Sequence, residues 1–118
     1  MAAQGIIDPA TEGKPLAAHI DEFIATLTAA GLLAGPLDFD APIDDASAAA
    51  VHALVGGAGS LLASVQFDDL VGETIATNLP GTDRERANWR RKLRPDIAAA
   101  FASPRGRAIL AALAKGRM

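Results

Sequence analysis

The sequence of 118 residues contains no cysteine, and its aromatic residues are four phenylalanines and one tryptophan. The absence of cysteine excludes disulfide bonds and thiolate metal sites, and it is typical of proteins in a reducing compartment. The first residues lack the basic flank and the apolar run of a signal peptide, so we expect a cytoplasmic protein. The weakly apolar stretch of residues 46–65 contains His52 and three glycines, so we expect no membrane-spanning segment.

Half of the residues are apolar, and alanine is the commonest of them. Burial stabilises a fold by roughly 25 cal/mol per Å² of apolar surface. An alanine side chain offers little such surface, so the core is expected to be thinner than the apolar content implies. At this length we expect one domain at most, with marginal stability of its own.

Acidic and basic residues are sorted along the chain. Residues 1–83 contain twelve acids and one base, whereas residues 84–118 contain ten bases and two acids. A basic segment of this kind either binds a polyanion such as nucleic acid or complements acidic groups of the same fold. We favour the second interpretation, because no stacking aromatics alternate with the arginines as single-strand binding requires. We therefore expect no nucleic-acid partner.

The first helical pattern follows a loop of about a dozen residues. A proline at residue 15 suits the first turn of a helix, and Gly31 suits its end. The spacing predicts that five apolar residues share one face of this helix. They are Leu16, Ile20, Phe23, Ile24 and Leu27.

Capping residues indicate three more helices. Asp44 or Asp45 would begin a helix that runs to about Val55, a short helix would follow Pro95, and Ser103 with the next proline would open a last one. The apolar positions of these helices are Val51, Leu54, Val55, Ile97, Phe101, Ile109, Leu110 and Leu113.

Residues 61–67, Leu-Leu-Ala-Ser-Val-Gln-Phe, predict the one β-strand of the chain. The run is apolar at nearly every position, a pattern typical of a strand buried on both faces of a parallel sheet. Such a strand needs neighbours for its backbone groups, and no second strand of similar quality is evident. The glycine-rich residues 56–60 precede this strand rather than follow one, so they indicate a connection and not a phosphate-binding loop.

A proline-glycine turn lies at the centre of Asn78-Leu79-Pro80-Gly81-Thr82. Thr82 and Glu85 have the spacing of a capping box, which predicts a helix from Thr82 onward. In that helix Trp89 and Leu93 would share one face. The basic residues Arg90, Arg91 and Arg94 would surround it.

Three motifs in order, residues 64–73, 78–82 and 88–93, resemble the C-terminal end of the 4-alpha-glucanotransferases, also called amylomaltases or disproportionating enzymes. The resemblance covers residues 61–93 firmly. Two positions differ from the family pattern: Asp68 stands where glutamate is more usual, and Ala87 where proline is usual. Neither difference lies in the turn itself.

The resemblance implies the fold expected here, which is mostly α with one isolated β-strand over residues 61–67. That strand would be the last of a (β/α)8 barrel whose other strands lie outside these 118 residues. The chain would then be a single C-terminal fragment. Residues 1–60 would form helices and loops, residues 61–82 the last strand and cleft loop, and residues 83–118 the terminal helices.

The resemblance also implies retaining transfer of α-1,4-glucan segments between maltodextrins, with no cofactor and no metal. The catalytic carboxylates would lie upstream, so no catalytic residue is expected here and the chain alone should be inactive. Asp68 and Asp69 cannot replace them, because neighbours on a strand point opposite ways. The expected glucan contacts are Asn78, Leu79, Pro80, Gly81 and Thr82, and the expected supports of the loop are Asp69, Glu85 and Trp89.

Alternatives remain for two of these residues and for the whole chain. Asn78 either binds paired sugar hydroxyls or caps its own turn. Trp89 either stacks on a sugar or packs its helix against the barrel, and we favour packing. The chain could instead be a free-standing helical protein whose basic C-terminal third binds an anionic partner, or a helical interaction module with no small ligand.

Overall fold

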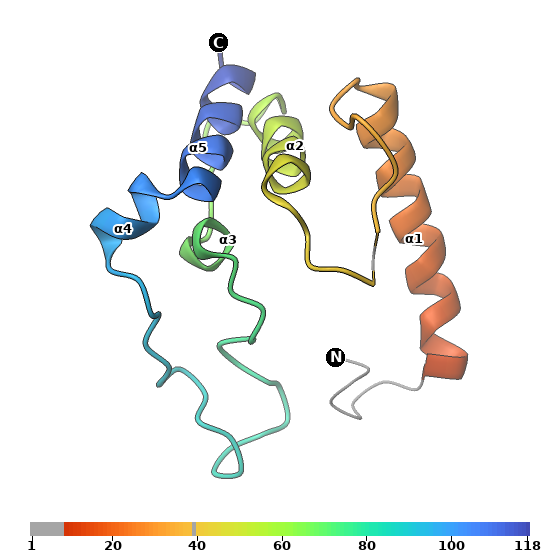
Figure 1. The fold of residues 1–118 in the computed structure, drawn as a ribbon. Coiled ribbons are helices and arrows are strands. Elements are labelled where there is room, and N and C mark those ends of the chain that lie inside the picture. The colour runs from red at the N-terminus through yellow and green to blue at the C-terminus, as the bar shows by residue number, and fades with distance from the viewer. Residues whose placement is uncertain (1–8, 39) are drawn as a thin grey trace.

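The computed structural model describes residues 9–38 and 40–118, with side chains from residue 16 onward in these ranges. Figure 1 shows a helical protein with a long irregular excursion between two of its helices. The helices within the described residues are α1 (Pro9–Ala29), α2 (Asp45–Gly56), α3 (Phe67–Val71), α4 (Ile97–Ala102) and α5 (Pro104–Gly116). None of them combines the length and the apolar character needed to cross a bilayer.

Helices α2 and α5 lie side by side and form the centre of the fold (Figure 1). Both begin as their capping residues predict: the Asp44 side chain accepts a hydrogen bond from the Ser47 N–H, and the Ser103 hydroxyl accepts one from the Gly106 N–H. Helix α4 also begins as expected, capped by Asp96. The helices predicted to begin at Asp44 or Asp45, after Pro95 and at Ser103 are therefore confirmed.

The core between these helices is small. Its buried members are Ala48 of α2, Leu70 of α3 and Ile109 of α5. Of the apolar positions predicted to face inward in α2, Val51 and Leu54 are half-buried and Val55 is exposed, while alanines, His52 and a glycine are the buried residues. In a thin core, small residues allow the closest approach of two backbones, so they take the interface and larger residues remain at its edge.

Glycines set the distance between α2 and α5. A methyl group added to Gly56 would overlap the backbone carbonyl of Leu113, and one added to Gly116 would lie 2.6 Å from the Gly57 nitrogen. The two helix backbones touch at their C-terminal ends, where any side chain beyond hydrogen would force them apart.

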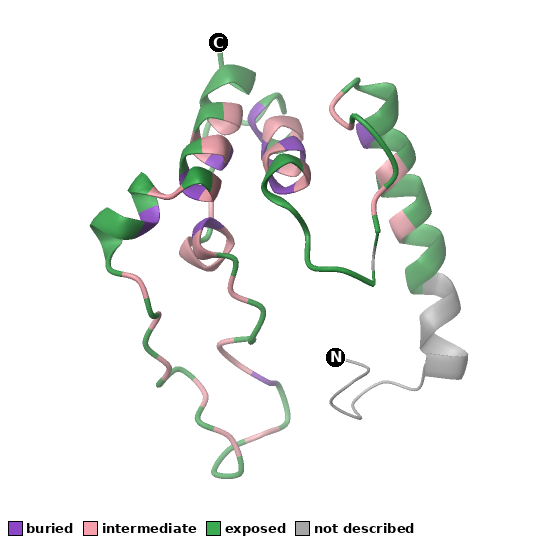
Figure 2. Cartoon of the chain, in the orientation of Figure 1, coloured by how far each residue is buried: buried purple, intermediate pink, exposed green. Residues whose placement is uncertain are grey.

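Helix α1 stands to one side of the other helices in Figure 1. It begins at Pro9 rather than at residue 15, so the loop expected up to Pro15 is wrong from residue 9, and residues 1–8 lie outside the described part. Leu27 is fully buried, but Leu16 and Phe23 of the same stripe are exposed. Figure 2 shows this helix as mainly exposed along its described length. Its apolar face is thus only partly covered.

The expectation of a mostly helical chain with one strand over residues 61–67, as the end of a (β/α)8 barrel, is wrong. The described residues contain no strand or sheet. Leu61 and Leu62 are 90% and 83% exposed, and residues 62–66 are irregular. Phe67 instead begins α3, whose first turn carries Asp68 and Asp69 near the positive end of the helix dipole. An apolar run stays a strand only when a neighbour pairs with its backbone, and none does here.

The helix predicted from Thr82 is also wrong. Residues 72–96 contain turns, bends and irregular backbone. Trp89 has a φ of 61°, in the left-handed region that a right-handed helix excludes. Side-chain hydrogen bonds to the backbone replace the helical ladder in this segment.

Candidate functional site

The candidate site is the loop of residues 73–95, which leaves α3 and returns to α4. In Figure 1 it extends well away from the helices. It has little apolar material to hold it, since Leu79 is its one buried apolar residue among those described. Polar side chains therefore have to fix its shape.

Asn88 holds the turn of residues 78–82. Its Oδ1 accepts hydrogen bonds from the Leu79 N–H at 3.0 Å and from Arg86 Nη1 at 3.1 Å. Its Nδ2 donates to the Thr82 hydroxyl at 2.8 Å and to the Thr82 carbonyl at 3.3 Å. One carboxamide thus uses both its donor and its acceptor to close the turn.

Two arginines tie the two arms of the loop together. Arg91 donates to Glu73 Oε2 at 2.6 Å and to the Ile75 carbonyl at 2.8 Å, and its Nη2 lies 3.7 Å from Asp68 Oδ2. Arg86 donates to the Ala76 carbonyl. The planar guanidinium can bind a carboxylate and a carbonyl at once, so these contacts fix direction as well as distance.

Glu73 anchors the start of the loop. Hydrogen bonds from the Ile75 and Thr74 amides, at 2.9 Å each, hold the pKa of its carboxyl below the ordinary glutamate value of 4.5, and the Arg91 charge lowers it further. The carboxylate form is the one that accepts all three contacts. Protonation would therefore weaken both the turn at residues 73–75 and the bridge to Arg91.

The residues expected to contact glucan lie together at the end of the loop. Asn78 and Thr82 are half-buried, Leu79 is buried, and Pro80 and Gly81 are exposed. Gly81 has a φ of +82°, which glycine adopts without strain and which the proline-glycine turn requires. The hydrogen bonds that close this turn come from Asn88 and Thr82, and the Asn78 carboxamide takes part in none of them.

Trp89 lies beside this turn with 75% of its surface exposed. Its backbone N–H donates to the Thr77 carbonyl at 3.0 Å, which fixes the left-handed backbone. The expectation that its ring packs a helix is wrong for this chain, because the helix is absent and the ring faces water. Asn88 points into the loop and Trp89 points out of it.

Of the other two expected supports, Asp69 contacts α2 and Glu85 makes a short-range contact within the loop. The side chain of Asp69 faces α2, with Oδ2 at 3.6 Å from His52 Nε2, and Asp68 rather than Asp69 approaches the loop. Glu85 accepts a hydrogen bond from the Asp83 N–H, so the capping box with Thr82 is not formed. Hydrogen bonds from its own amide and from Asp83 lower the Glu85 pKa.

Sequence reasoning missed the residues that hold the loop, which are Asp68, Glu73, Arg86, Asn88 and Arg91. A signal was available for some of them, because Asn88 and Arg91 belong to the third family-like motif and Glu73 ends the first. An arginine that pairs with a carboxylate 18 positions away has no local sequence pattern. Only the folded chain reveals that partner.

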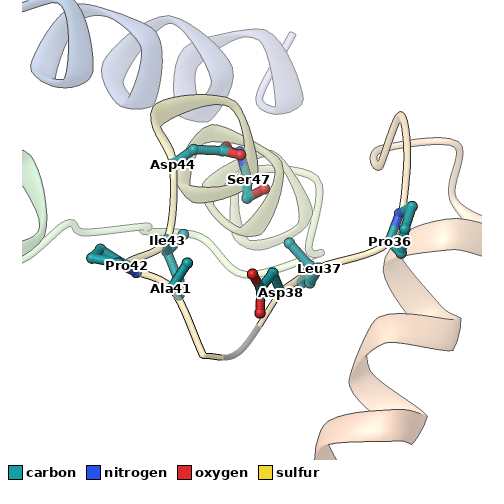
Figure 3. Close-up of a pocket in the computed structure, with 8 residues that line it drawn as sticks. All are labelled: Pro36, Leu37, Asp38, Ala41, Pro42, Ile43, Asp44 and Ser47. Carbon is teal, nitrogen blue, oxygen red and sulfur yellow. The ribbon is translucent and has the colours of Figure 1, made fainter.

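Several pockets lie nearer the helices. Figure 3 shows one of about 140 Å³ at the start of α2, with Leu37 and Asp38 on one arm of a loop and Ala41 and Pro42 on the other. It is below the range of about 300–1,000 Å³ typical of ligand sites. Another, of about 330 Å³, is lined in part by His52 and Asp69, and a larger one of about 550 Å³ is lined mainly by small residues of α2 and α5. The described residues contain no group of three or more histidine or acidic side chains placed to hold a metal ion.

No protein-family model, curated protein sequence or solved structure matches the chain. The family resemblance of residues 61–93 therefore rests on the three sequence motifs alone.

Proposed function

We propose that the chain supplies a glucan-binding loop to a 4-alpha-glucanotransferase, which transfers α-1,4-glucan segments between maltodextrins by a retaining mechanism. The observation that carries this proposal is the convergence of the three family-like motifs. Asp68 and Glu73 of the first contact Arg91 of the third, and Asn88 of the third closes the turn formed by the second. Motifs that share one hydrogen-bonded unit are expected to serve one role.

The end of this unit has the chemistry of a sugar site. Asn78 offers an amide donor and an acceptor, the pair that neighbouring sugar hydroxyls require. Because Asn88 already closes the turn, Asn78 is not needed for that purpose. Gly81 is exposed and lacks a side chain, so a glucan can approach its backbone closely.

The proposal assigns binding and not chemistry to this chain. Retaining transfer needs two carboxyl groups about 5 Å apart on either side of the scissile bond. Asp68 and Glu73 are instead committed to Arg91 and to the loop's own hydroxyl and amide groups. The nucleophile and the acid would come from another part of the enzyme, and no cofactor is involved.

Calorimetric titration of the chain with maltoheptaose tests the binding. We expect saturable heat with maltoheptaose and none with cellohexaose, whose β-1,4 linkage gives a different curvature. The Asn78→Ala variant should bind at least about tenfold more weakly, as loss of a buried hydrogen-bond pair implies. Gln66→Ala removes an exposed carboxamide outside the loop and should bind normally. Equal affinity for Asn78→Ala and the unchanged chain would contradict the assigned role.

Incubation with maltotriose tests the absence of chemistry. We expect neither glucose nor longer oligomers above a blank without protein, by chromatography of the products. Formation of both would show that the chain carries its own catalytic groups, contrary to the proposal.

A polyanion-binding role is the second candidate, and the exposure of four basic residues favours it. Arg86, Arg91, Arg105 and Arg117 are held by internal contacts, but Arg84, Arg90, Lys92 and Arg94 of the loop are exposed. This role predicts retention on heparin that falls steeply with salt. Replacing both Arg90 and Lys92 by glutamine would then shorten retention. Weak retention at low salt would exclude this candidate.

A further inference from the structure

The surface around Trp89 carries an inference that rests on the proposed function and extends it. Trp89 is a large aromatic residue left 75% exposed on a loop that has almost no apolar packing of its own. Its backbone has a φ of 61°, a conformation that costs a residue with a side chain about 1–2 kcal/mol. The exposed ring adds little to the packing of the loop. Positions kept in such a conformation against this cost tend to serve a ligand.

The loop contacts explain how this conformation is kept. The Trp89 N–H donates to the Thr77 carbonyl, and the preceding residue, Asn88, is fixed by contacts to Leu79 and Thr82. Asn88 is held toward the inside of the loop and the Trp89 N–H is bonded to Thr77. The indole ring therefore lies on the outer, exposed side of the loop. The ring is therefore presented by a preorganised backbone, which lowers the entropic cost of binding.

The neighbour of the ring identifies the kind of ligand. The Thr77 carbonyl that binds the Trp89 amide belongs to the peptide bond between Thr77 and Asn78. The backbones of Trp89 and Asn78 thus lie next to each other on adjacent arms of the loop, and one carries an exposed aromatic ring while the other carries an uncommitted carboxamide. A pyranose has an apolar C–H face and hydroxyl groups at its edge, so it matches this pair. A purely apolar partner would leave the Asn78 carboxamide without a hydrogen-bond partner, and a phosphate has no apolar face to stack on the Trp89 indole.

We infer that Trp89 is the stacking platform for one glucose residue of the bound α-1,4-glucan, with Asn78 binding hydroxyl groups of that glucan. Trp89 is then a substrate-binding residue, and the residues that hold the loop in shape are Asn88, Arg86 and Arg91. The neighbouring Arg90 is exposed and can add donors at the rim of the site.

Fluorescence of the chain reports on this site directly, because Trp89 is its one tryptophan. Titration with maltoheptaose should shift the emission to shorter wavelength as the sugar displaces water from the indole. The midpoint should agree with the dissociation constant from calorimetry. Cellohexaose should cause no shift. These readings need no variant and use the chain as it is.

Two variants complete the test. Trp89→Ala should bind maltoheptaose about tenfold or more weakly, the loss expected for an aromatic contact surface, whereas Trp89→Phe keeps a ring and should bind within a few-fold of the unchanged chain. Circular dichroism should show the same helix content in both, since Trp89 lies outside the helices.

The outcomes separate the two proposals. Calorimetric binding without an emission shift, together with full affinity of Trp89→Ala, would overturn the stacking role and leave the glucan-binding loop intact. Absence of any binding would overturn both. An emission shift that saturates with maltoheptaose and is paired with weak binding of Trp89→Ala supports both.

Discussion

The backbone N–H of Leu79 donates a 3.0 Å hydrogen bond to Oδ1 of Asn88, nine positions further along the chain. This bond joins the two arms of the 73–95 loop at the point where Leu79, its one buried apolar residue, turns inward. The other half of the same carboxamide binds Thr82. Removing Asn88 would therefore affect the whole turn at once.

Asn88→Ala should destabilise the loop by about 1–3 kcal/mol, because the partly buried Leu79 amide and Thr82 groups lose their partner. Hydrogen exchange at the Leu79 amide should accelerate, while exchange in α2 and α5 should not change. Asn88→Asp keeps an acceptor for Leu79 and Arg86 but loses the donor to Thr82. Its exchange rate at the Leu79 amide should therefore lie between those of the unchanged chain and Asn88→Ala. A slow Leu79 amide in Asn88→Ala would show that another group holds the turn.

The Glu73 contacts predict a pH dependence of the loop. The folded chain lowers the Glu73 pKa through the Ile75 and Thr74 amides and Arg91, so the carboxylate stabilises the fold above the ordinary value of 4.5. That contribution is lost as the pH falls through the lowered folded value. The Ile75 amide resonance should follow this titration.

Glu73→Gln provides the control, since its Ile75 amide resonance should not follow the acid titration seen in the unchanged chain. Glu22→Gln, at an exposed position of α1, should leave Ile75 unchanged. An Ile75 amide that does not respond to acid in the unchanged chain would contradict the Glu73 contact.

The contact between α2 and α5 predicts a strong effect of one methyl group. Gly56→Ala would overlap the Leu113 carbonyl, and separating two backbones should lower the free energy of unfolding by about 1–3 kcal/mol. Gly59→Ala meets no atom within 4 Å and should be neutral or slightly stabilising. Urea denaturation followed by circular dichroism measures both. Equal stability of the two variants would mean that the helices lie further apart.

The left-handed backbone of Trp89 predicts that glycine is preferred to alanine at this position. Both substitutions remove the ring, but only Trp89→Gly relieves the positive φ, so it should be about 1 kcal/mol more stable than Trp89→Ala. Because the loop can open locally, hydrogen exchange at the Trp89-position amide is the suitable measurement. Faster exchange in the glycine variant would contradict the strained backbone.

Helices α2, α4 and α5 could be predicted from the sequence because their capping signals are local. Asp44 and Ser103 bind amides three residues away, so the pattern and the contact occupy the same short segment. The run of residues 61–67 could not be assigned in the same way. Its apolar composition permits a strand, but pairing depends on distant residues, and in its absence Phe67 joins a helix.

The loop was mispredicted because two local signals competed. Thr82 and Glu85 have the spacing of a helix start, but the Thr82 hydroxyl donates to the Leu79 carbonyl and accepts from Asn88. Polar side chains that bind nearby backbone in this way compete with helix formation. The chemistry expected at Asn78 and Gly81 depended on the turn alone, and the proline-glycine turn was predicted correctly.

The exposed pair Leu61 and Leu62 affects how the chain behaves in concentrated solution. Both side chains face water, and no backbone N–H of residues 61–66 donates to a backbone carbonyl within the described part of the chain. An exposed apolar segment whose backbone groups are unpaired can pair with the same segment of another molecule. Aggregation should thus increase with protein concentration at temperatures well below the melting of any helix. The Leu62→Lys variant should stay in solution at higher protein concentrations, without any effect on the loop of residues 73–95.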